Sequence, residues 1–422
     1  MSSPAPSEAQ LRRNLLLGVA NGTLGRFFRD LTDPALVLTW FASQLGASAL
    51  VIGLLQPISR GAGFLAQVLS AGSIQQLPRK MAAYRVMAVL RAFIWSLLVA
   101  AVFWIANRSA SLLLALFLLI YVVFSMLRGA SALTFMDIVG KAIPSDRRGT
   151  FFGWRQFSGG LLALAGSALV RYILDERTSP GFPFNFGWLF AIAGLAGMVG
   201  WLCFALVTEP DAPVRSDALP FGEQLRRMGY IVRHNGNYAR FMLSMVALLT
   251  STVALPFYTV FAREQLGAPT SMAGAYLGVF TAGSVGSTLL WGRLSDRRGN
   301  RMVLWLVGLL SIPVPLLSLL FGVGISYSAF ALAFLLLGSS RSGLEMGYMN
   351  FVLDAAPAAE RVLYVTVANT VSGVVNLLLV AGAVIAEHWG LNVVLAVSCV
   401  CALLSVFLIG AVREPRRYGV RP

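Results

Sequence analysis

The chain has 422 residues, of which 57% are apolar and only 12% are charged, and its mean hydropathy is +0.74. Soluble domains are about a quarter charged, so a soluble chain of this length would lack the polar residues needed to cover its surface. This composition excludes a soluble globular protein. The formal net charge of +15 would fit nucleic-acid binding, but the positions of the charges argue against that partner.

Apolar segments of about 20 to 28 residues recur along the chain, which is the length that a helix needs to cross a bilayer. Strands of a membrane barrel would instead be about ten residues long and would alternate in polarity. We therefore predict an all-α polytopic membrane protein. Its twelve transmembrane helices are expected at residues 14–43, 49–72, 82–106, 110–137, 150–174, 187–207, 238–263, 270–292, 302–323, 327–353, 361–386 and 391–411.

The first predicted span follows a polar start, Met1 to Asn14, and no A-x-A-like cleavage site comes after it. We therefore expect an uncleaved first span, and not a signal peptide. The three cysteines, Cys203, Cys399 and Cys401, lie inside apolar segments without the spacing of metal ligands or of a disulfide framework.

Basic residues lie mainly on one side of the predicted spans. Of the 33 Lys and Arg residues, 22 lie in or beside the even-numbered loops and the termini, three lie on the opposite side, and eight lie within spans. Such a bias is typical of cytoplasmic loops, so we predict that both termini are cytoplasmic. The positive charge is then a topology signal, and we expect no nucleic-acid partner.

Internal repeats relate the first six predicted spans to the last six. The sequence Leu45-Gly46-Ala47 recurs as Leu266-Gly267-Ala268, in each case between the first and second spans of a half, and Arg128 recurs as Arg341. Both halves have the same orientation, so they are parallel pseudo-repeats. A cavity between two such halves, open alternately to each side, is the physical basis of a rocking transporter.

The repeat predicts three parts: an N-terminal half at 1–207, a cytoplasmic linker at 208–237 and a C-terminal half at 238–422. The linker contains an amphipathic segment around Phe221 to Arg233, which is predicted to be helical. Its apolar side could face lipid while its arginines stay in water.

The most specific local sequence is Gly292 to Arg301, which reads GRLSDRRGNR in the loop between the eighth and ninth spans. It resembles the G-x-L-x-D-R-x-G-R-[KR] signature of the major facilitator superfamily. Together with the six-plus-six arrangement of spans, the resemblance covers almost the whole chain. It implies the twelve-helix transporter fold of that family.

The resemblance also implies a conformational latch, in which this loop holds the two halves in one state. The predicted latch residues are Gly292, Asp296, Arg297, Gly299 and Arg301. The glycines would permit close packing and a tight turn, the arginines would add cytoplasmic anchoring, and Asp296 would reach the start of the fifth span near Gly149-Thr150, where a helix N-terminus favours an anion. Turn formation and topology alone are the alternative interpretation.

The equivalent loop of the first half departs from the signature. Gln75 stands where Asp296 is expected and Pro78 stands where Gly299 is expected, so the chain resembles a divergent branch or has a one-sided latch. The fifth span lacks the Gly-Pro pair typical of drug antiporters in this family. That absence weakens an efflux interpretation without excluding it.

Ionisable residues inside the membrane are costly and are therefore candidate functional residues. The first span carries Arg26, Arg29, Asp30 and Asp33 on one helical face, with Arg26–Asp30 and Arg29–Asp33 at i,i+4 spacing. The four residues either handle substrate or protons, or form two self-neutralising pairs that lock the first span against the fifth. Pro34 is predicted to break the helix beside them.

Further candidates for substrate binding or coupling are Arg60, Arg128, Arg341 and Glu345. Arg341 and Glu345 are at i,i+4 spacing, and a simple ion pair would explain both. Arg128, followed by Gly129, resembles a reduced form of the span-4 arginine motif that the family links to proton coupling.

We therefore predict a proton-coupled secondary transporter that moves a small polar or anionic solute by alternating access, whether as symporter or antiporter. The alternatives are an efflux antiporter for amphipathic compounds and a non-transporting receptor or scaffold with the same fold. No hydrolase, metalloprotease or ATP-binding motif is present, so we predict no enzyme activity, no cofactor and no metal. The expected partners are the solute, protons or another coupling ion, and the lipid bilayer. We expect a monomer in the bacterial cytoplasmic membrane.

Overall fold

The computed structural model describes residues 7–75, 77, 79–105, 108–175, 180–210, 221–321, 324, 326–357 and 360–415. All secondary structure in these residues is helical, and each of the twelve predicted spans contains one or more helices. Among the described residues, nine helical segments are long and apolar enough to cross a membrane. The other three predicted spans, 14–43, 150–174 and 327–353, contain helices of 24, 29 and 29 residues that are less apolar.

Two compact units make up the chain, and each includes a short segment from the other half of the sequence. Unit 1 comprises Met1–Ala47, Ile58–Ser216 and Thr270–Gly278, and unit 2 comprises Ser48–Pro57, Asp217–Pro269 and Val279–Pro422. The boundaries at 1–207, 208–237 and 238–422 stay a prediction.

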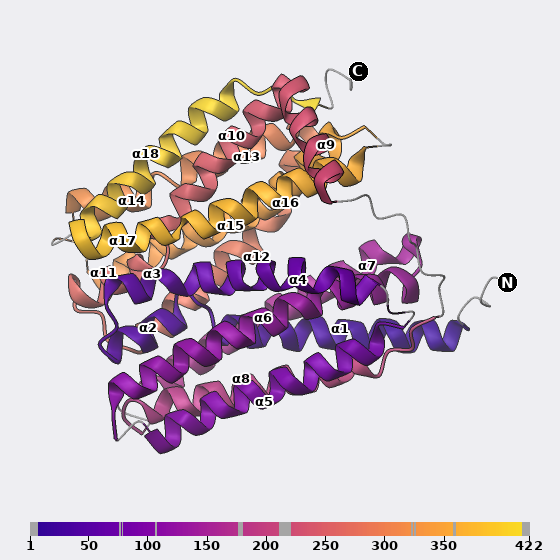
Figure 1. Ribbon diagram of the computed structural model, residues 1–422. Helices are drawn as coiled ribbons and strands as arrows, with labels where there is room; N and C mark the ends of the chain where they lie inside the picture. Colours follow the sequence, from indigo (N-terminus) through magenta and orange to yellow (C-terminus); the bar gives the residue numbers. More distant parts are fainter. Residues whose placement is uncertain are drawn as a thin grey trace. The chain divides into compact units, whose positions relative to one another are not determined.

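Unit 1 is a bundle of long helices. It contains α1 (Glu8–Leu31), α2 (Val37–Gln44), the π-helical turn η1 (Ile58–Ala62), α4 (Gly63–Gln75), α5 (Met81–Ile105), α6 (Ala110–Ala142), α7 (Ser145–Ile173) and α8 (Phe184–Ala205). Helices α1, α5, α6 and α8 run side by side (Figure 1). Ser7 starts α1 and Ser109 starts α6, and each hydroxyl accepts a hydrogen bond from the backbone N–H three residues later, which satisfies one of the free donors of a helix start.

Aromatic rings fill the interior of unit 1. The ring centroid of Trp95 lies 4.7 Å from that of Phe28 and 5.1 Å from that of Phe124, and Trp201 lies 5.5 Å from Phe28. Such pairs contribute about 0.5–1.5 kcal/mol each beyond their burial. The Trp95 indole N–H donates to the Phe190 carbonyl at 2.9 Å, so its polar atom is satisfied within the core. This core packs directly against α1.

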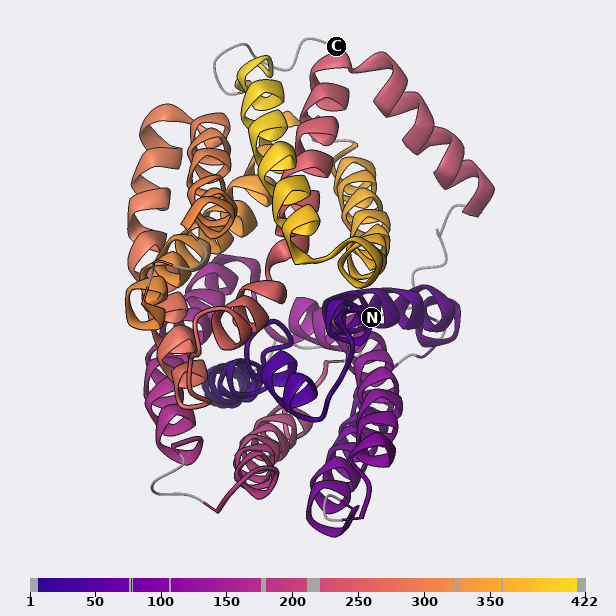
Figure 2. The ribbon, with the colours of Figure 1, turned by 90° about the vertical axis from the view of Figure 1, so that its left-hand side faces the viewer.

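Unit 2 is likewise helical. It contains α3 (Ala49–Pro57), α9 (Phe221–His234), α10 (Gly236–Ser251), the 3-10 turn η2 (Thr252–Ala254), α11 (Phe257–Glu264), most of α12 (Met272–Arg298), α13 (Asn300–Leu310), α14 (Pro313–Phe321), α15 (Tyr327–Ala355), α16 (Arg361–Leu378), α17 (Val380–Trp389) and α18 (Leu391–Gly410). Helix α10 lies between α16 and α18, which Figure 2 shows from the side (α18 in yellow). Its core includes Tyr238, Phe241, Phe351 and Tyr364.

The predicted amphipathic helix of the linker is present as α9. Its Ile231 is only 5% exposed and belongs to the core of unit 2, and Met228 and Val232 pack against that core. The expectation that the apolar side of this helix faces lipid is therefore wrong for Met228 and Ile231. They pack on protein because α9 leads directly into α10 and contacts α16.

Candidate functional site

The charged face predicted for the first span lies on the last turns of α1. Arg26 Nε lies 3.6 Å from Asp30 Oδ2, and the two side chains are 12% and 22% exposed, so the expected i,i+4 ion pair is present. The Arg26 side chain lies over Gly159 of α7, where a Cβ would collide with it. Asp30 Oδ2 has no hydrogen-bond donor among the described residues. A partly buried carboxylate with an unused acceptor position is suited to binding a proton or a solute.

The helix break expected at Pro34 is also present, because α1 ends at Leu31 and α2 begins at Val37. The Asp33 carboxylate accepts hydrogen bonds from the backbone N–H groups of Ala35 and Leu36 at 2.8 and 3.0 Å. A side-chain oxygen that satisfies free N–H groups stabilises a turn of this kind. Asp33 therefore holds the break, a structural role that the sequence analysis did not assign to it. Arg29 is exposed.

The first span of the second half breaks at the corresponding place. Helix α10 ends at Ser251, η2 follows, and α11 begins at Phe257 directly after Pro256. The spacing that relates Leu45 to Leu266 in the internal repeat also relates Asp30 to Ser251. Interrupted helices at matching positions of two repeats free backbone groups inside the membrane and mark the binding region in transporters.

Arg60 and Arg128 lie at an irregular turn in unit 1. Arg60 belongs to η1, and a π-helical turn holds an extra residue and is frequent at functional sites. Arg128 of α6 donates to the Ser59 carbonyl and, at 2.8 Å, to the Ser59 hydroxyl. The next residue, Gly129, touches the backbone of Gly63, so α4 and α6 approach closely here. Arg128 thus braces η1, and its coupling role stays a prediction.

In unit 2, Arg341 and Glu345 form the ion pair that their spacing predicted, with Arg341 Nη2 2.7 Å from Glu345 Oε1. Glu345 is the more exposed partner, at 60% against 30% for Arg341. Arg341 also lines a cavity of about 40 Å³ that lies beside the break between α10 and α11. This pair and the Arg26–Asp30 pair lie in different units.

The signature loop forms the turn between α12 and α13. Gly299 adopts φ +89°, a conformation that other residues rarely adopt, which confirms its predicted role in the turn. Gly292 differs, because a Cβ at that position would meet no described atom within 4 Å, so the expectation of close packing at Gly292 is wrong. Asp296 and Arg297 are exposed.

Arg301 connects two helices, in addition to the cytoplasmic anchoring predicted for it. Its guanidinium donates to the carbonyls of Ile409 and Gly410 at 3.3 and 2.7 Å, and it thereby binds the start of α13 to the end of α18. The predicted contact of Asp296 with Gly149-Thr150 stays a prediction, since the side chains at 149 and 150 lie outside the described residues.

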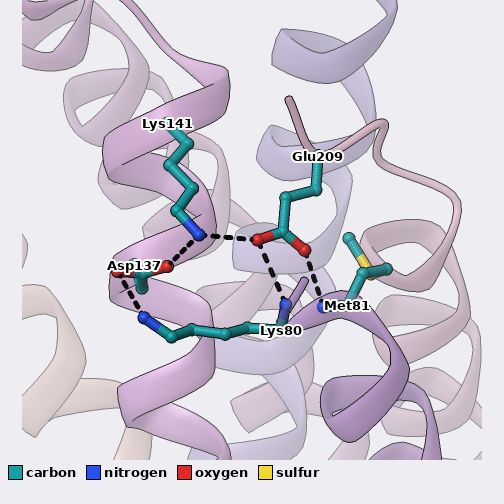
Figure 3. A network of polar contacts seen from close by, with 5 residues as sticks. All are labelled: Lys80, Met81, Asp137, Lys141 and Glu209. Atoms are coloured by element: carbon teal, nitrogen blue, oxygen red, sulfur yellow. Dashed lines mark hydrogen bonds and ion pairs between the residues drawn. The ribbon is translucent and has the colours of Figure 1, made fainter. Parts of the chain in front are cut away.

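Sequence reasoning missed an ion cluster in unit 1, drawn in Figure 3. The cluster consists of Lys80, Asp137, Lys141 and Glu209. Asp137 lies 2.8 Å from the Lys80 ammonium and 2.7 Å from that of Lys141, and Lys141 lies 2.9 Å from Glu209. Glu209 is almost fully buried and accepts hydrogen bonds from the backbone N–H groups of Lys80 and Met81, so it also caps the start of α5. An acidic group at a helix N-terminus stabilises that helix, and ion pairs between helices stabilise the packing of those helices.

Unit 2 repeats the acidic cap. Glu414 accepts a hydrogen bond from the Arg301 backbone N–H at 2.8 Å at the start of α13. Glu209 and Glu414 follow the last predicted span of their halves, and each is itself followed by proline. This repeated Glu-Pro pair is the sequence signal that would have revealed both caps.

A reciprocal amide contact accompanies each cap, and we call it the amide clasp. In unit 1 the Asn14 amide bonds the peptide groups of Thr208, with both hydrogen bonds at 3.1 Å. In unit 2 the Asn237 amide bonds those of Arg413 at 3.0 and 2.7 Å. The same device thus closes the corresponding end of each unit.

Comparison with known proteins agrees with this architecture. The family model described as Major Facilitator Superfamily matches residues 19–380 and 240–422. Uncharacterized proteins of Mycobacterium tuberculosis and Mycobacterium bovis are 23% identical over 306 residues, covering 69% of this chain, and the chain spans 56% of their length.

Solved structures share the fold over nearly the whole chain. A nucleoside transporter superposes with a TM-score of 0.70 at 11% identity, covering 96% of this chain and 99% of that one. A D-xylose-proton symporter superposes with a TM-score of 0.69 at 13% identity, covering 96% of this chain and 98% of that one. A bacterial homologue of the iron transporter ferroportin superposes with a TM-score of 0.65 at 16% identity, covering 96% of this chain and 98% of that one. The chain is therefore an integral membrane protein with multiple spans, and it belongs to the major facilitator superfamily of transporters.

Proposed function

We propose that the chain is a secondary active transporter that moves a small polar or anionic solute by alternating access, coupled to protons. The observation that carries this proposal is the pair of helix breaks at Asp33–Leu36 and Thr252–Pro256. Each break adjoins ionisable groups: Arg26 and Asp30 in one unit, and Arg341 in the other. Charged groups at membrane depth are costly and are retained where they serve transport.

Asp30 is the proposed proton-binding residue. It combines partial burial, an ion pair with Arg26 and an acceptor oxygen without a donor among the described residues. Protonation would remove its charge and weaken its attraction to Arg26, so proton binding and local rearrangement would be linked. Asp33 is a weaker candidate because its carboxylate already caps the break.

The proposed setting is a bacterial cytoplasmic membrane, with both termini in the cytoplasm and a monomeric chain. The matches to mycobacterial proteins and the one-sided distribution of basic residues support this setting. The signature loop around Asp296 is the proposed conformational latch. An exposed acid next to the turn at Gly299 leaves that carboxylate available for a second helix end.

Reconstitution tests the transport proposal directly. The full chain is inserted into vesicles with an imposed pH gradient, and uptake of a broad panel of sugars, nucleosides, carboxylates and amphipathic cations is followed. We expect flux of at least one polar solute that collapses when a protonophore dissipates the gradient. Folded protein of known orientation that moves none of the panel would contradict the proposal and favour a receptor or scaffold.

A further inference from the structure

The cavity beside the helix break of unit 2 is lined by hydroxyl groups among apolar side chains. Its polar lining consists of Ser251, Thr252, Tyr258, Ser311, Ser340 and Arg341, contributed by the broken first helix of the half, by the end of α13 and by α15. Its volume of about 40 Å³ exceeds the roughly 10–15 Å³ that one water molecule needs on the same measure. The cavity therefore has room for a hydroxyl group.

Three of these hydroxyls are committed as donors. Ser251, Thr252 and Ser311 donate to backbone carbonyls of the preceding helical turn at 2.7, 2.7 and 2.8 Å. A hydroxyl has one proton to donate and two lone pairs to accept with. With their protons used in this way, these three oxygens present lone pairs to the cavity.

Ser340 supplies a donor that has no partner of its own in the described part of the chain. It is 7% exposed, and its Oγ has no hydrogen-bond partner among the described residues. The serines beside it both have one, since Ser339 donates to the Gly283 carbonyl and Ser342 pairs with Thr288. Leaving a buried hydroxyl without a partner costs free energy, and a bound group would recover it.

The charge of Arg341 is already balanced, because Glu345 lies 2.7 Å from it. A carboxylate in the cavity would meet the lone pairs of three hydroxyl oxygens with no net positive charge to compensate. A hydroxyl group can accept from Ser340 and donate to one of the acceptors at the same time. The chemistry of the lining therefore favours a neutral group over an anion.

We propose that this cavity is a solute subsite that receives a hydroxyl group of an uncharged polyol, with Ser340 as the donor that positions it. The proposal rests on the transport function proposed above and narrows its solute class from polar or anionic to uncharged and hydroxyl-bearing. Ser251, Thr252 or Ser311 accepts the proton of the bound hydroxyl.

Thermal stabilisation of the purified full chain tests the subsite, because a ligand that binds the native state raises its melting temperature. The probes are three matched pairs: glycerol with glycerate, xylitol with xylonate, and sorbitol with gluconate. We expect at least one polyol to stabilise the protein more than its acid does. In Ser340→Ala and the near-isosteric Ser340→Cys, the half-saturating concentration should rise about tenfold, the loss expected for one hydrogen bond.

Ser405→Ala is the matched control, since Ser405 is also buried and donates within its own helix but does not line the cavity. It should leave the half-saturating concentration unchanged. Preference for the acids, no stabilisation by any polyol, or equal binding by wild type and both Ser340 variants would each overturn the subsite. Flux in vesicles separates the two proposals: Ser340-dependent binding without flux defeats the transport function alone, and flux without dependence on Ser340 defeats the subsite alone.

Discussion

The two units close one end with the same backbone device but surround it with different charges. In unit 1 the acidic cap Glu209 also contacts Lys141, which is held by Asp137. The spacing that relates Arg128 to Arg341 pairs Lys141 with Asp354 of unit 2, whose carboxylate accepts a hydrogen bond from the Asn300 side chain at 2.7 Å. The cap and the amide clasp are therefore common to the two repeats, whereas Lys141 of the ion cluster has an acidic counterpart in unit 2.

The first spans of the two units also differ in charge at their breaks. Unit 1 has Asp30 one residue before the end of α1, and unit 2 has Ser251 at the corresponding end of α10. At the break itself, unit 1 thus places an acid, and unit 2 places hydroxyl groups beside Arg341. This division suggests that the unit 1 groups respond to proton binding and that the unit 2 groups recognise the solute.

The largest expected effect comes from exchanging Asp30. Asp30→Asn should abolish pH-driven flux, because an amide cannot take up and release a proton, whereas Ser251→Ala removes one acceptor of the proposed subsite and should weaken solute binding while the flux stays dependent on pH. Flux in vesicles under an imposed pH gradient measures both. Asp33→Asn is the matched acidic control: its amide oxygen can still cap Ala35 and Leu36, so flux should persist. Wild-type pH dependence in Asp30→Asn would remove Asp30 from the coupling mechanism.

The second largest effect is expected on the free energy of unfolding when the two acidic caps are neutralised. Glu209→Gln should lower the free energy of unfolding by about 2 kcal/mol, because it removes the charged, nearly buried partner of Lys141 while Asp137 still neutralises that ammonium. Glu414→Gln should cost only about 1 kcal/mol, since an amide oxygen can retain part of the hydrogen bond with the Arg301 backbone N–H.

Melting temperatures of the two glutamate variants in detergent check this ranking. The double variant Glu209→Gln/Lys141→Met should recover part of the loss, because it removes both charges of the pair together. Equal losses for the two single variants would mean that the ion cluster adds nothing to the cap.

The smallest difference is expected at the amide clasps. Asn14→Ala and Asn237→Ala each remove two hydrogen bonds to the backbone of one residue, so each should cost about 1–2 kcal/mol. Asn14 is buried and Asn237 is partly exposed, which places Asn14 at the upper end of that range. Denaturant titration of the two variants in the same detergent would resolve the order. A loss confined to one variant would show that the clasps are not equivalent.

Local sequence features predicted much of this molecule. Hydropathy located the helices, Pro34 located the first break, and Gly299 located the turn of the signature loop. Each depends on residues that are close in sequence, so composition and backbone preference suffice to find it. The capping role of Asp33 was also accessible, since an aspartate directly before a Pro-initiated turn is a known capping pattern.

The caps and the ion cluster were not predicted because their partners are distant in the chain. Glu209 meets Met81 across 128 residues, and Glu414 meets Arg301 across 113. Charge at a predicted loop edge looks like ordinary solvated charge, and only folding brings the partners together. Loops of unequal length also give the two Glu-Pro pairs a different spacing from the one that relates Arg128 to Arg341, so the repeat did not align them.

The π-helical turn at Ile58–Ala62 contains one residue more than an ordinary α-helical turn, and one hydrogen bond of Arg128 depends on that extra residue. Removing one residue from this turn would restore ordinary helical geometry and rotate the following segment by about 100° relative to the preceding one. The Ser59 carbonyl would then be taken up within the helix, and Arg128 would lose its carbonyl acceptor. Among relatives, we therefore expect deletion of that residue and replacement of this arginine to be inherited together, as one event in the history of the fold.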